Sequence, residues 1–154
     1  MRADMPPVRA RPAGLARVLV RTPVLLYRLG LGGLIAKHTL LLTTTGRRSG
    51  RPRVVPLDYQ QEGDTFYLIA EGGSRSPWFR NLVANPEVEV QVGSRRMKGM
   101  ATPLTDAKEK AIVLRLFQQR SARMAERYYG IPRAASDGDL LALAPRRAVA
   151  AVRK

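Results

Sequence analysis

The sequence contains no cysteine, and its 154 residues include a single histidine, His38. The absence of cysteine excludes disulfide bonds, thiolate catalysis and cysteine-ligated metal sites, and it favours a reducing or redox-neutral compartment. One histidine cannot form a metal cluster with others, and at the start of an expected strand a structural role is favoured for it. The spacing of the remaining residues shows no nucleophile–base pair and no carboxylate dyad. If the chain is an enzyme, its reactive atoms are therefore expected to belong to a bound cofactor.

Acidic residues and long apolar runs are also scarce. The chain has 12 Asp+Glu against 27 Lys+Arg, and its formal net charge of +15 attracts polyanions such as nucleic acid, an anionic membrane or a multiply charged cofactor. No run approaches the ~20 apolar residues that span a bilayer. Arg17, Arg21 and Arg28 interrupt the apolar N-terminal runs, which argues against an export signal. We therefore expect a cytoplasmic protein with one domain.

The N-terminal part of the chain is basic and divides into two expected segments. Residues 1–12, rich in proline and arginine, are predicted to be a flexible basic arm. Residues 13–38 are predicted to form N-terminal helices, the second of which opens at Pro23 after Thr22 as N-cap. This amphipathic, basic segment suits capping the open side of a β core, which is the favoured interpretation. The alternative is peripheral association with an anionic membrane, at its inner face.

The remainder of the chain is predicted to be an antiparallel β structure with packed helices. Strands are expected at residues 40–45, 53–60, 65–70, 87–92 and 96–102, with tight turns at 62–64 and 93–94. Helices are expected at 77–84 and from Thr105, as cap, through Tyr128 to the stop at Gly130. Of the tail segments 140–144 and 148–152, the later is favoured as a strand. The order predicts an α+β, mainly β fold whose sheet curls toward a barrel.

The most informative stretch is the hairpin of residues 40–57. A β-prone run enters a turn bounded by Gly46 and Gly50, and the returning run carries Arg51 and Arg53. Guanidinium groups, a hydroxyl group and free backbone N–H groups suit a phosphate or a polycarboxylate. The spacing is not that of a P-loop. A solvated basic hairpin tip explains this stretch alone equally well.

Two further segments could contact a ligand. The loop of Gly72 and Gly73 lets a ligand approach the backbone closely. The helix that starts at Ser76-Pro77-Trp78 has an N-terminus that attracts anions, and Trp78 offers a stacking face. The structural alternatives are a core position for Trp78 and a solvated helix position for Asn81.

Several ordered motifs resemble the deazaflavin (coenzyme F420)-dependent nitroreductase family, which are small split-β-barrel oxidoreductases. They are Leu-Thr-Thr-Thr-Gly-Arg-Arg-Ser-Gly-Arg-Pro-Arg-x-x-Pro-Leu at 42–57, Gly-Asp at 63–64, Ala-x-Gly-Gly at 70–73, Pro-Trp-Phe-x-Asn-Leu at 77–82 and Ala-Asn-Pro-Glu-Val at 84–88. The resemblance implies a split β-barrel, similar to FMN-binding split barrels, of about six antiparallel strands over residues 39–154. It implies coenzyme F420 (8-hydroxy-5-deazaflavin) as cofactor, and FMN on the same barrel is the alternative.

The resemblance also implies which residues would hold the cofactor. The clamp on its phosphate and oligoglutamate tail corresponds to Arg47, Arg48, Ser49 and Arg53. The segment along the ring system corresponds to Val55, Pro56, Leu57 and Tyr59. The backbone at the deazaflavin edge corresponds to Ala70, Gly72 and Gly73, and Trp78 and Asn81 complete the pocket. The loop between Gly73 and Trp78 is shorter than is usual in the family, and Arg75 is the only candidate for the lysine often found there.

The implied activity is hydride transfer between F420 and a small electrophile such as a quinone, an enone or a nitroaromatic. No catalytic residue is assigned. The candidates for lining the substrate side and giving the proton are Tyr128, Tyr129 and Tyr27, with structural packing favoured for each. A non-enzymatic polyanion-binding protein is the rival class, but no specific nucleic-acid partner is expected, because the sequence lacks interleaved aromatic residues, a helix-turn-helix and a zinc module. Family barrels often pair, so a homodimer is an expected assembly.

Overall fold

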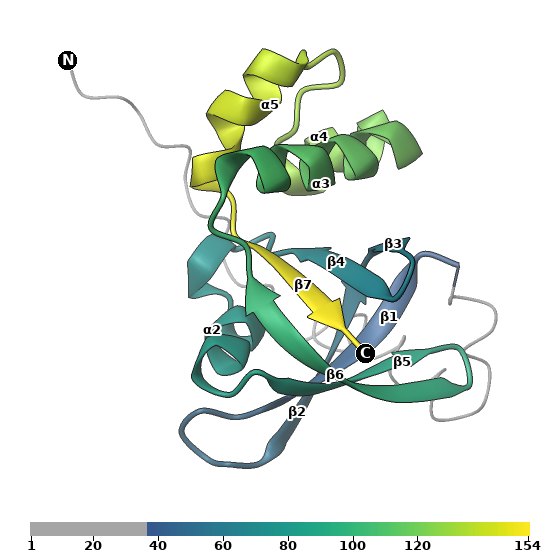
Figure 1. Ribbon diagram of the computed structural model, residues 1–154, viewed down its shortest axis with the longest axis vertical. Coiled ribbons are helices and arrows are strands. Elements are labelled where there is room, and N and C mark those ends of the chain that lie inside the picture. Colours follow the sequence, from purple (N-terminus) through teal and green to yellow (C-terminus); the bar gives the residue numbers. More distant parts are fainter. Residues whose placement is uncertain (1–36) are drawn as a thin grey trace, which may run out of the picture.

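The computed structural model describes residues 37–154, so the arm and most of the N-terminal segment predicted above lie outside the described residues (Figure 1). The strands of this part are β1 (Thr39–Thr45), β2 (Pro52–Asp58), β3 (Gln60–Glu62), β4 (Thr65–Ile69), β5 (Glu87–Val92), β6 (Arg95–Pro103) and β7 (Val149–Arg153). The helices are η2 (Gly73–Arg75), α2 (Pro77–Ala84), α3 (Ala107–Arg120), α4 (Ala122–Tyr129), α5 (Asp137–Leu143) and η3 (Ala144–Arg146).

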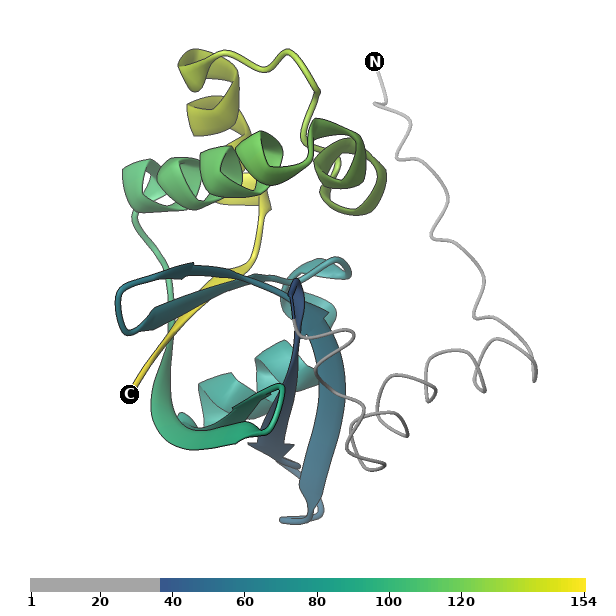
Figure 2. The ribbon, with the colours of Figure 1, turned by 90° about the vertical axis from the view of Figure 1, so that its right-hand side faces the viewer.

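The strands form one antiparallel sheet in the order β2-β1-β5-β6-β7-β4-β3. Both edges belong to neighbouring segments of the chain: β2 ends with Asp58 opposite Thr39, and β3 begins with Gln60 opposite Tyr67. Because only Tyr59 separates the two edge strands, the sheet has to curl back on itself, as Figure 2 shows. The predicted mainly β, barrel-like fold class is confirmed. The single strand predicted for residues 53–60 is wrong, since the chain changes partner strand at Tyr59.

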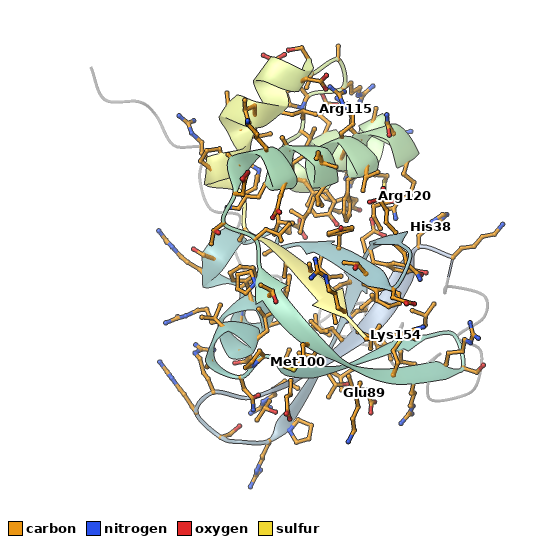
Figure 3. The ribbon with its side chains drawn as sticks, in the orientation of Figure 1. His38, Glu89, Met100, Arg115, Arg120 and Lys154 are labelled. Carbon is orange, nitrogen blue, oxygen red and sulfur yellow. The ribbon has the colours of Figure 1, made fainter. Side chains whose placement is uncertain are left out.

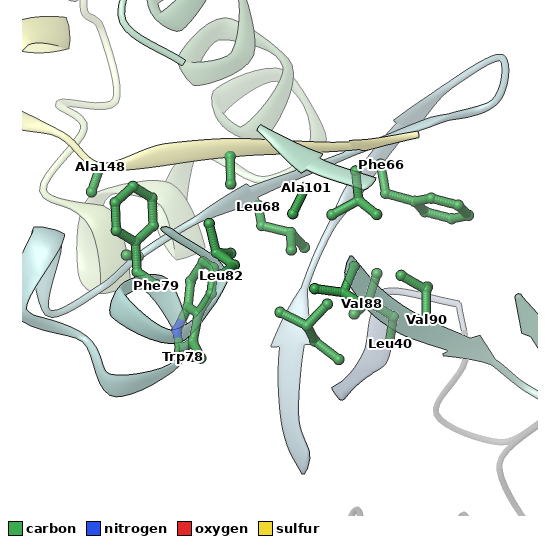
Figure 4. Packing of buried hydrophobic residues seen from close by; sticks show 14 residues of the cluster. Leu40, Phe66, Leu68, Trp78, Phe79, Leu82, Val88, Val90, Ala101 and Ala148 are labelled. Carbon is green, nitrogen blue, oxygen red and sulfur yellow. The ribbon is translucent and has the colours of Figure 1, made fainter. Parts of the chain in front are cut away.

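The inside of the curled sheet holds one apolar core, and α2 closes it. Trp78, Phe79 and Leu82 of α2 point toward the side chains of β1, β4, β5 and β6, as Figure 4 shows. On β4, Phe66 and Leu68 face this core, whereas Tyr67 and Ile69 contribute to a second one on the other face. The alternation of the strand therefore places apolar side chains on two covered faces. This confirms the prediction that both faces of residues 65–70 are covered.

Helices α3, α4 and α5 form a layer over the outer face of the sheet, where the second core lies (Figures 1 and 2). The single helix predicted from Thr105 to Tyr128 is wrong. Two helices, α3 and α4, occupy this stretch. The N-cap of α3 is Asp106, whose carboxylate accepts from the N–H groups of Lys108 and Glu109. The chain leaves the helical conformation at Ser121, whose side chain caps α4. The predicted stop at Gly130 is confirmed, with φ 62°.

The chain tail supplies a helix and then a strand. Residues 137–143 are the helix α5, which a capping box of Ser136 and Asp139 opens, and β7 is the later segment that was favoured as a strand. Among residues 37–154, none of the helices is long and apolar enough to cross a bilayer.

Arg120 connects the helical layer to the place where the chain crosses between the sheet edges (Figure 3). Its guanidinium group forms an ion pair with Asp58, and its Nη1 donates to the carbonyl oxygen of Tyr59 at 2.8 Å. The side chains of Arg120 and Asp58 are only 21% and 25% exposed. The guanidinium also lies 5.5 Å from the ring centroid of Phe117. One side chain thus fixes α3 against the end of β2.

We expect Arg120→Met to lower the free energy of unfolding by about 1 to 3 kcal/mol, because a half-buried carboxylate and a carbonyl lose a charged donor. Urea unfolding measures the change. The matched control is Arg123→Met on the exposed face of α4, which should cost less than about 0.5 kcal/mol. Equal losses for the two variants would show that Arg120 does not connect the layers.

Candidate functional site

The loop between β1 and β2 is closed by its own backbone. Gly46 N donates to Arg51 O at 2.8 Å, and Gly50 N donates to Gly46 O at 2.8 Å. Gly50 has φ +65°, a conformation that favours glycine. Arg47 and Arg48 occupy the exposed tip of this turn. The predicted hairpin is therefore present and presents its arginines to solvent.

The side chain of Asn81 holds this loop against α2. Its Oδ1 accepts from the backbone N of Arg47 at 3.3 Å and from Arg47 Nη1 at 3.1 Å. Its Nδ2 donates to Thr44 Oγ1 on β1 at 3.1 Å. Asn81 is 4% exposed, so the alternative of a solvated helix residue is wrong. These bonds join a helix, a strand and a loop at one buried amide.

Trp78 combines the two roles that the sequence left open. It is 8% exposed and belongs to the inner core, where its ring lies edge-on to Phe79 with centroids 5.7 Å apart. It also lines two cavities on the surface of the curled sheet. A core residue can therefore form the floor of a binding site.

The first cavity, which we call the arginine pocket, has a volume of about 380 Å³. It is lined by Thr44, Gly46, Arg47, Arg48, Ser49, Arg53, Val54, Val55, Pro77, Trp78 and Asn81. Partial desolvation and the neighbouring charges of Arg80 and Arg48 lower the pKa of Arg47 below its ordinary value. Within residues 37–154, none of the arginines of this pocket forms an ion pair. Their charge is therefore available to an anionic ligand.

The second cavity, the tyrosine pocket, has a volume of about 450 Å³. It is lined by Thr39, Val55, Pro56, Leu57, Asp58, Ile69, Glu71, Gly72, Ser76, Pro77, Trp78, Met124, Tyr128 and Tyr129. It shares Val55, Pro77 and Trp78 with the arginine pocket, so the two form one cleft along β2. The cleft is cationic at one end and mainly apolar and aromatic at the other. Such an arrangement suits a ligand with an anionic part and a flat part.

The predicted loop residues and most of the predicted ring-side residues line this cleft, but three predicted positions that the structure describes, Tyr59, Ala70 and Gly73, do not. Ala70 and Gly73 line a smaller cavity beyond Tyr128 and Tyr129. Their N–H groups donate to Ala148 O and Ala70 O, both at 2.9 Å. Tyr59 packs against the inner core, with its ring centroid 5.7 Å from that of Phe66, and lines none of the three cavities. Tyr27 lies outside the described residues.

Sequence reasoning missed Thr44, Asp58, Glu71 and Met124. Met124 and Tyr128 are four residues apart on α4, so they share a face, and this spacing was a usable signal. The burial of Tyr129 and the charge of Asp58 raise the pKa of the Tyr129 phenol above its ordinary value, so this phenol keeps its proton over a wider pH range than an exposed tyrosine does.

We expect Asn81→Ala to lower the free energy of unfolding by about 1 to 3 kcal/mol and to speed amide exchange at Arg47, because a buried donor and acceptor are removed. Hydrogen exchange and urea unfolding measure the two effects. The control is Asn85→Ala directly after the same helix, where the Oδ1 accepts, among the described contacts, only from Glu87 N at 3.3 Å. Unchanged exchange at Arg47 in Asn81→Ala would contradict the role of this amide.

Comparison with known proteins places this geometry among described families. A family profile with the description "F420H(2)-dependent quinone reductase" matches residues 19–134. The F420H(2)-dependent quinone reductases Rv1261c and MT1299, from two strains of Mycobacterium tuberculosis, are each 43% identical over 72 residues, which make up 45% of this chain and 48% of each relative. The chain thus spans about half the length of the curated relatives it matches.

Solved structures agree with the profile at the level of the fold. A structure described as F420-H2 dependent reductase (FDR-A) has a TM-score of 0.55 and 27% identity, over 76% of this chain and 95% of that chain. Another, described as a domain-swapped dimer, has a TM-score of 0.56 and 26% identity, over 76% of this chain and 81% of that chain.

Proposed function

The chain belongs to the F420H(2)-dependent quinone reductase family, and we propose that it transfers a hydride between coenzyme F420 and a quinone-type electrophile. An enone or a nitroaromatic offers similar electrophilic chemistry. The observation that carries the proposal is the cleft in which arginines that form no ion pair within the described part of the chain adjoin an aromatic pocket. The rival, a non-enzymatic polyanion-binding surface, accounts for the arginines but not for the aromatic half.

The residues of the cleft fit such a coenzyme. Arg47, Arg48, Ser49 and Arg53 would hold the phosphate and the oligoglutamate tail, because they line a cavity in which no carboxylate of residues 37–154 neutralises the arginines. Val55, Pro56, Leu57 and Trp78 would flank the rings with apolar and aromatic surface. Gly72 lines the same cavity, and among the described contacts no hydrogen bond engages its N–H. That N–H is thus available to an oxygen at the edge of the ring system.

When bound, reduced F420 would supply the hydride, and the protein would supply orientation and exclusion of water. Tyr128 and Tyr129 form the wall of the tyrosine pocket that faces away from the loop. Since Tyr129 keeps its proton at neutral pH, it can donate a hydrogen bond to an acceptor oxygen and steady the charge that develops there. Tyr128, at 40% exposure, is the alternative proton donor in contact with solvent.

FMN is the second candidate cofactor, because a phosphate clamp alone does not distinguish flavin from deazaflavin. Trp78 is the sole tryptophan and lines both pockets, so its fluorescence should fall when either pocket is filled. We expect F420 to quench the fluorescence of Trp78 and FMN to quench it little. Free tryptophan titrated in parallel corrects for the light that each compound absorbs. The double change Arg47→Gln and Arg48→Gln should raise the Kd for F420 by about tenfold or more, and the effect should shrink at high salt.

The matched control for this titration is Arg95→Gln with Arg96→Gln. It removes the same charge from β6, beyond the 93–94 turn, and these residues line neither pocket. Equal weakening in both double variants would mean that net charge alone attracts the coenzyme, and quenching only by FMN would favour the second candidate. Hydride transfer itself is followed as the return of oxidised F420 absorbance when a quinone is added to reduced F420 without oxygen. No acceleration by the protein would refute the proposed activity.

Two proposals concern assembly. A structural neighbour is described as a domain-swapped dimer, which supports a homodimer of this chain. The basic segment 13–38 and a lipid-soluble acceptor support peripheral contact with an anionic membrane. Sedimentation of the full chain with and without anionic vesicles tests both. We expect a mass of two chains in the free protein, and vesicle binding that neutral vesicles and high salt abolish. A single-chain mass, or binding to neutral vesicles, would contradict the respective proposal.

A further inference from the structure

A third cavity lies beyond the two tyrosines, and the activity proposed above does not use it. It has a volume of about 210 Å³ and shares Glu71, Tyr128 and Tyr129 with the tyrosine pocket. The tyrosine pocket meets the arginine pocket at other residues, namely Val55, Pro77 and Trp78. The third cavity therefore adjoins a different wall of the tyrosine pocket. Its cationic residues are Arg146 and Arg147. We call it the Arg146–Arg147 pocket.

Arg147 is held in place by carbonyl groups. Its Nε donates to Tyr129 O at 2.8 Å, and its Nη1 lies 3.4 Å from Arg146 O. No hydrogen bond engages its Nη2 among the described contacts. Gly130 makes room for this group, because a Cβ there would lie 2.8 Å from Nη2. The guanidinium group is thus oriented by the protein, with one N–H face left for a ligand.

The charge of this pocket is not neutralised from within. Glu71 lines it, yet in the described part of the chain neither Arg146 nor Arg147 forms an ion pair with any carboxylate. Burial and the charge of Arg146 lower the pKa of Arg147 below its ordinary value, as is expected for a cation without a counter-ion. An anion that reached Nη2 would relieve this repulsion. Glu71 lies on the wall that this pocket shares with the tyrosine pocket, and its carboxylate would repel an anion placed next to that wall.

We propose that the Arg146–Arg147 pocket binds a carboxylate substituent of the electron acceptor, while the quinone ring occupies the tyrosine pocket. This inference rests on the proposed function and adds the class of acceptor. The small volume suits one charged group on a short arm, and the fork of Arg147 suits the geometry of a carboxylate. Arg146 and Arg147 are specificity-determining residues, because they contact the substituent and not the reacting carbonyl carbon.

The test compares a naphthoquinone that carries a carboxymethyl group with its methyl ester. In the F420H2-dependent reaction of the full chain, we expect the KM of the acid to be about tenfold lower than that of the ester, which is the usual effect of one charge-assisted hydrogen bond. Arg147→Gln and Arg146→Gln should each reduce this ratio by raising the KM of the acid more than that of the ester. Arg147→Lys should retain part of it, and Glu71→Gln should increase it. Arg123→Gln, an exposed change on α4, is the control and should leave it unchanged.

Calorimetric titration of the acid and the ester into the protein without coenzyme separates this inference from the proposed function. Tighter binding of the acid, lost in Arg147→Gln and kept in Arg123→Gln, supports the pocket even if neither compound is reduced. If both compounds are reduced with equal KM and bind equally, the proposed function stands and the carboxylate pocket is refuted. Arg146 is exposed and has no side-chain partner among the described contacts, so Arg146→Gln decides the question if Arg147→Gln does not fold.

Discussion

The buried amide of Asn81 is the constraint on which the cleft depends. Its oxygen and nitrogen bond to the loop at Arg47 and to Thr44 of β1, and the side chain belongs to α2. An amide in this position is costly to bury unless both of its atoms are bonded, so the loop and the helix are stable only in this relation. Trp78 lies one turn earlier on the same helix, and the arginines are consequently held at a fixed place beside its ring. Fixing cationic groups before a ligand arrives lowers the entropy lost on binding.

The curl of the sheet determines where the remaining wall of the cleft, formed by residues of α4, is placed. Since β2 and β3 are the two edges and only Tyr59 separates them, the edge strand that follows the arginine loop runs directly to the place where α3 is anchored. Arg120 fixes this crossing through Asp58 and Tyr59 O. The helical layer then places Met124, Tyr128 and Tyr129 across from Leu57 and Trp78. A cationic end, an apolar and aromatic middle and a second cationic pocket thus follow one another, formed by segments far apart in the sequence.

The parts of this structure that depend on local signals were predictable. The glycine-bounded hairpin, the stop at Gly130 and the two-sided strand 65–70 follow from turn chemistry and alternation, and the family followed from the resemblance of ordered motifs. The break at Ser121 was missed because helix-forming residues continue on both sides of it, and only the cap of α4 marks it. The hydrogen bonds of Asn81 could not be predicted from sequence, since its partners are 34 and 37 residues away. Tyr59 was expected at the rings from the resemblance. In the structure its side chain packs against the inner core, as those of Val55 and Leu57 do, and unlike them it lines none of the three cavities.

The central claim is that one cleft binds the coenzyme in a single direction, with its anionic part on the loop of residues 46–50 and its rings between β2 and α4. A crystal structure of the full chain with F420 tests this most directly. The account predicts the phosphate within hydrogen-bonding distance of Arg47 and Arg48, and the ring system against Leu57 and Trp78, with the side of the tyrosine pocket at Tyr128 and Tyr129 left for the acceptor. A coenzyme bound in the reverse direction, or on the opposite face of the sheet, would contradict it.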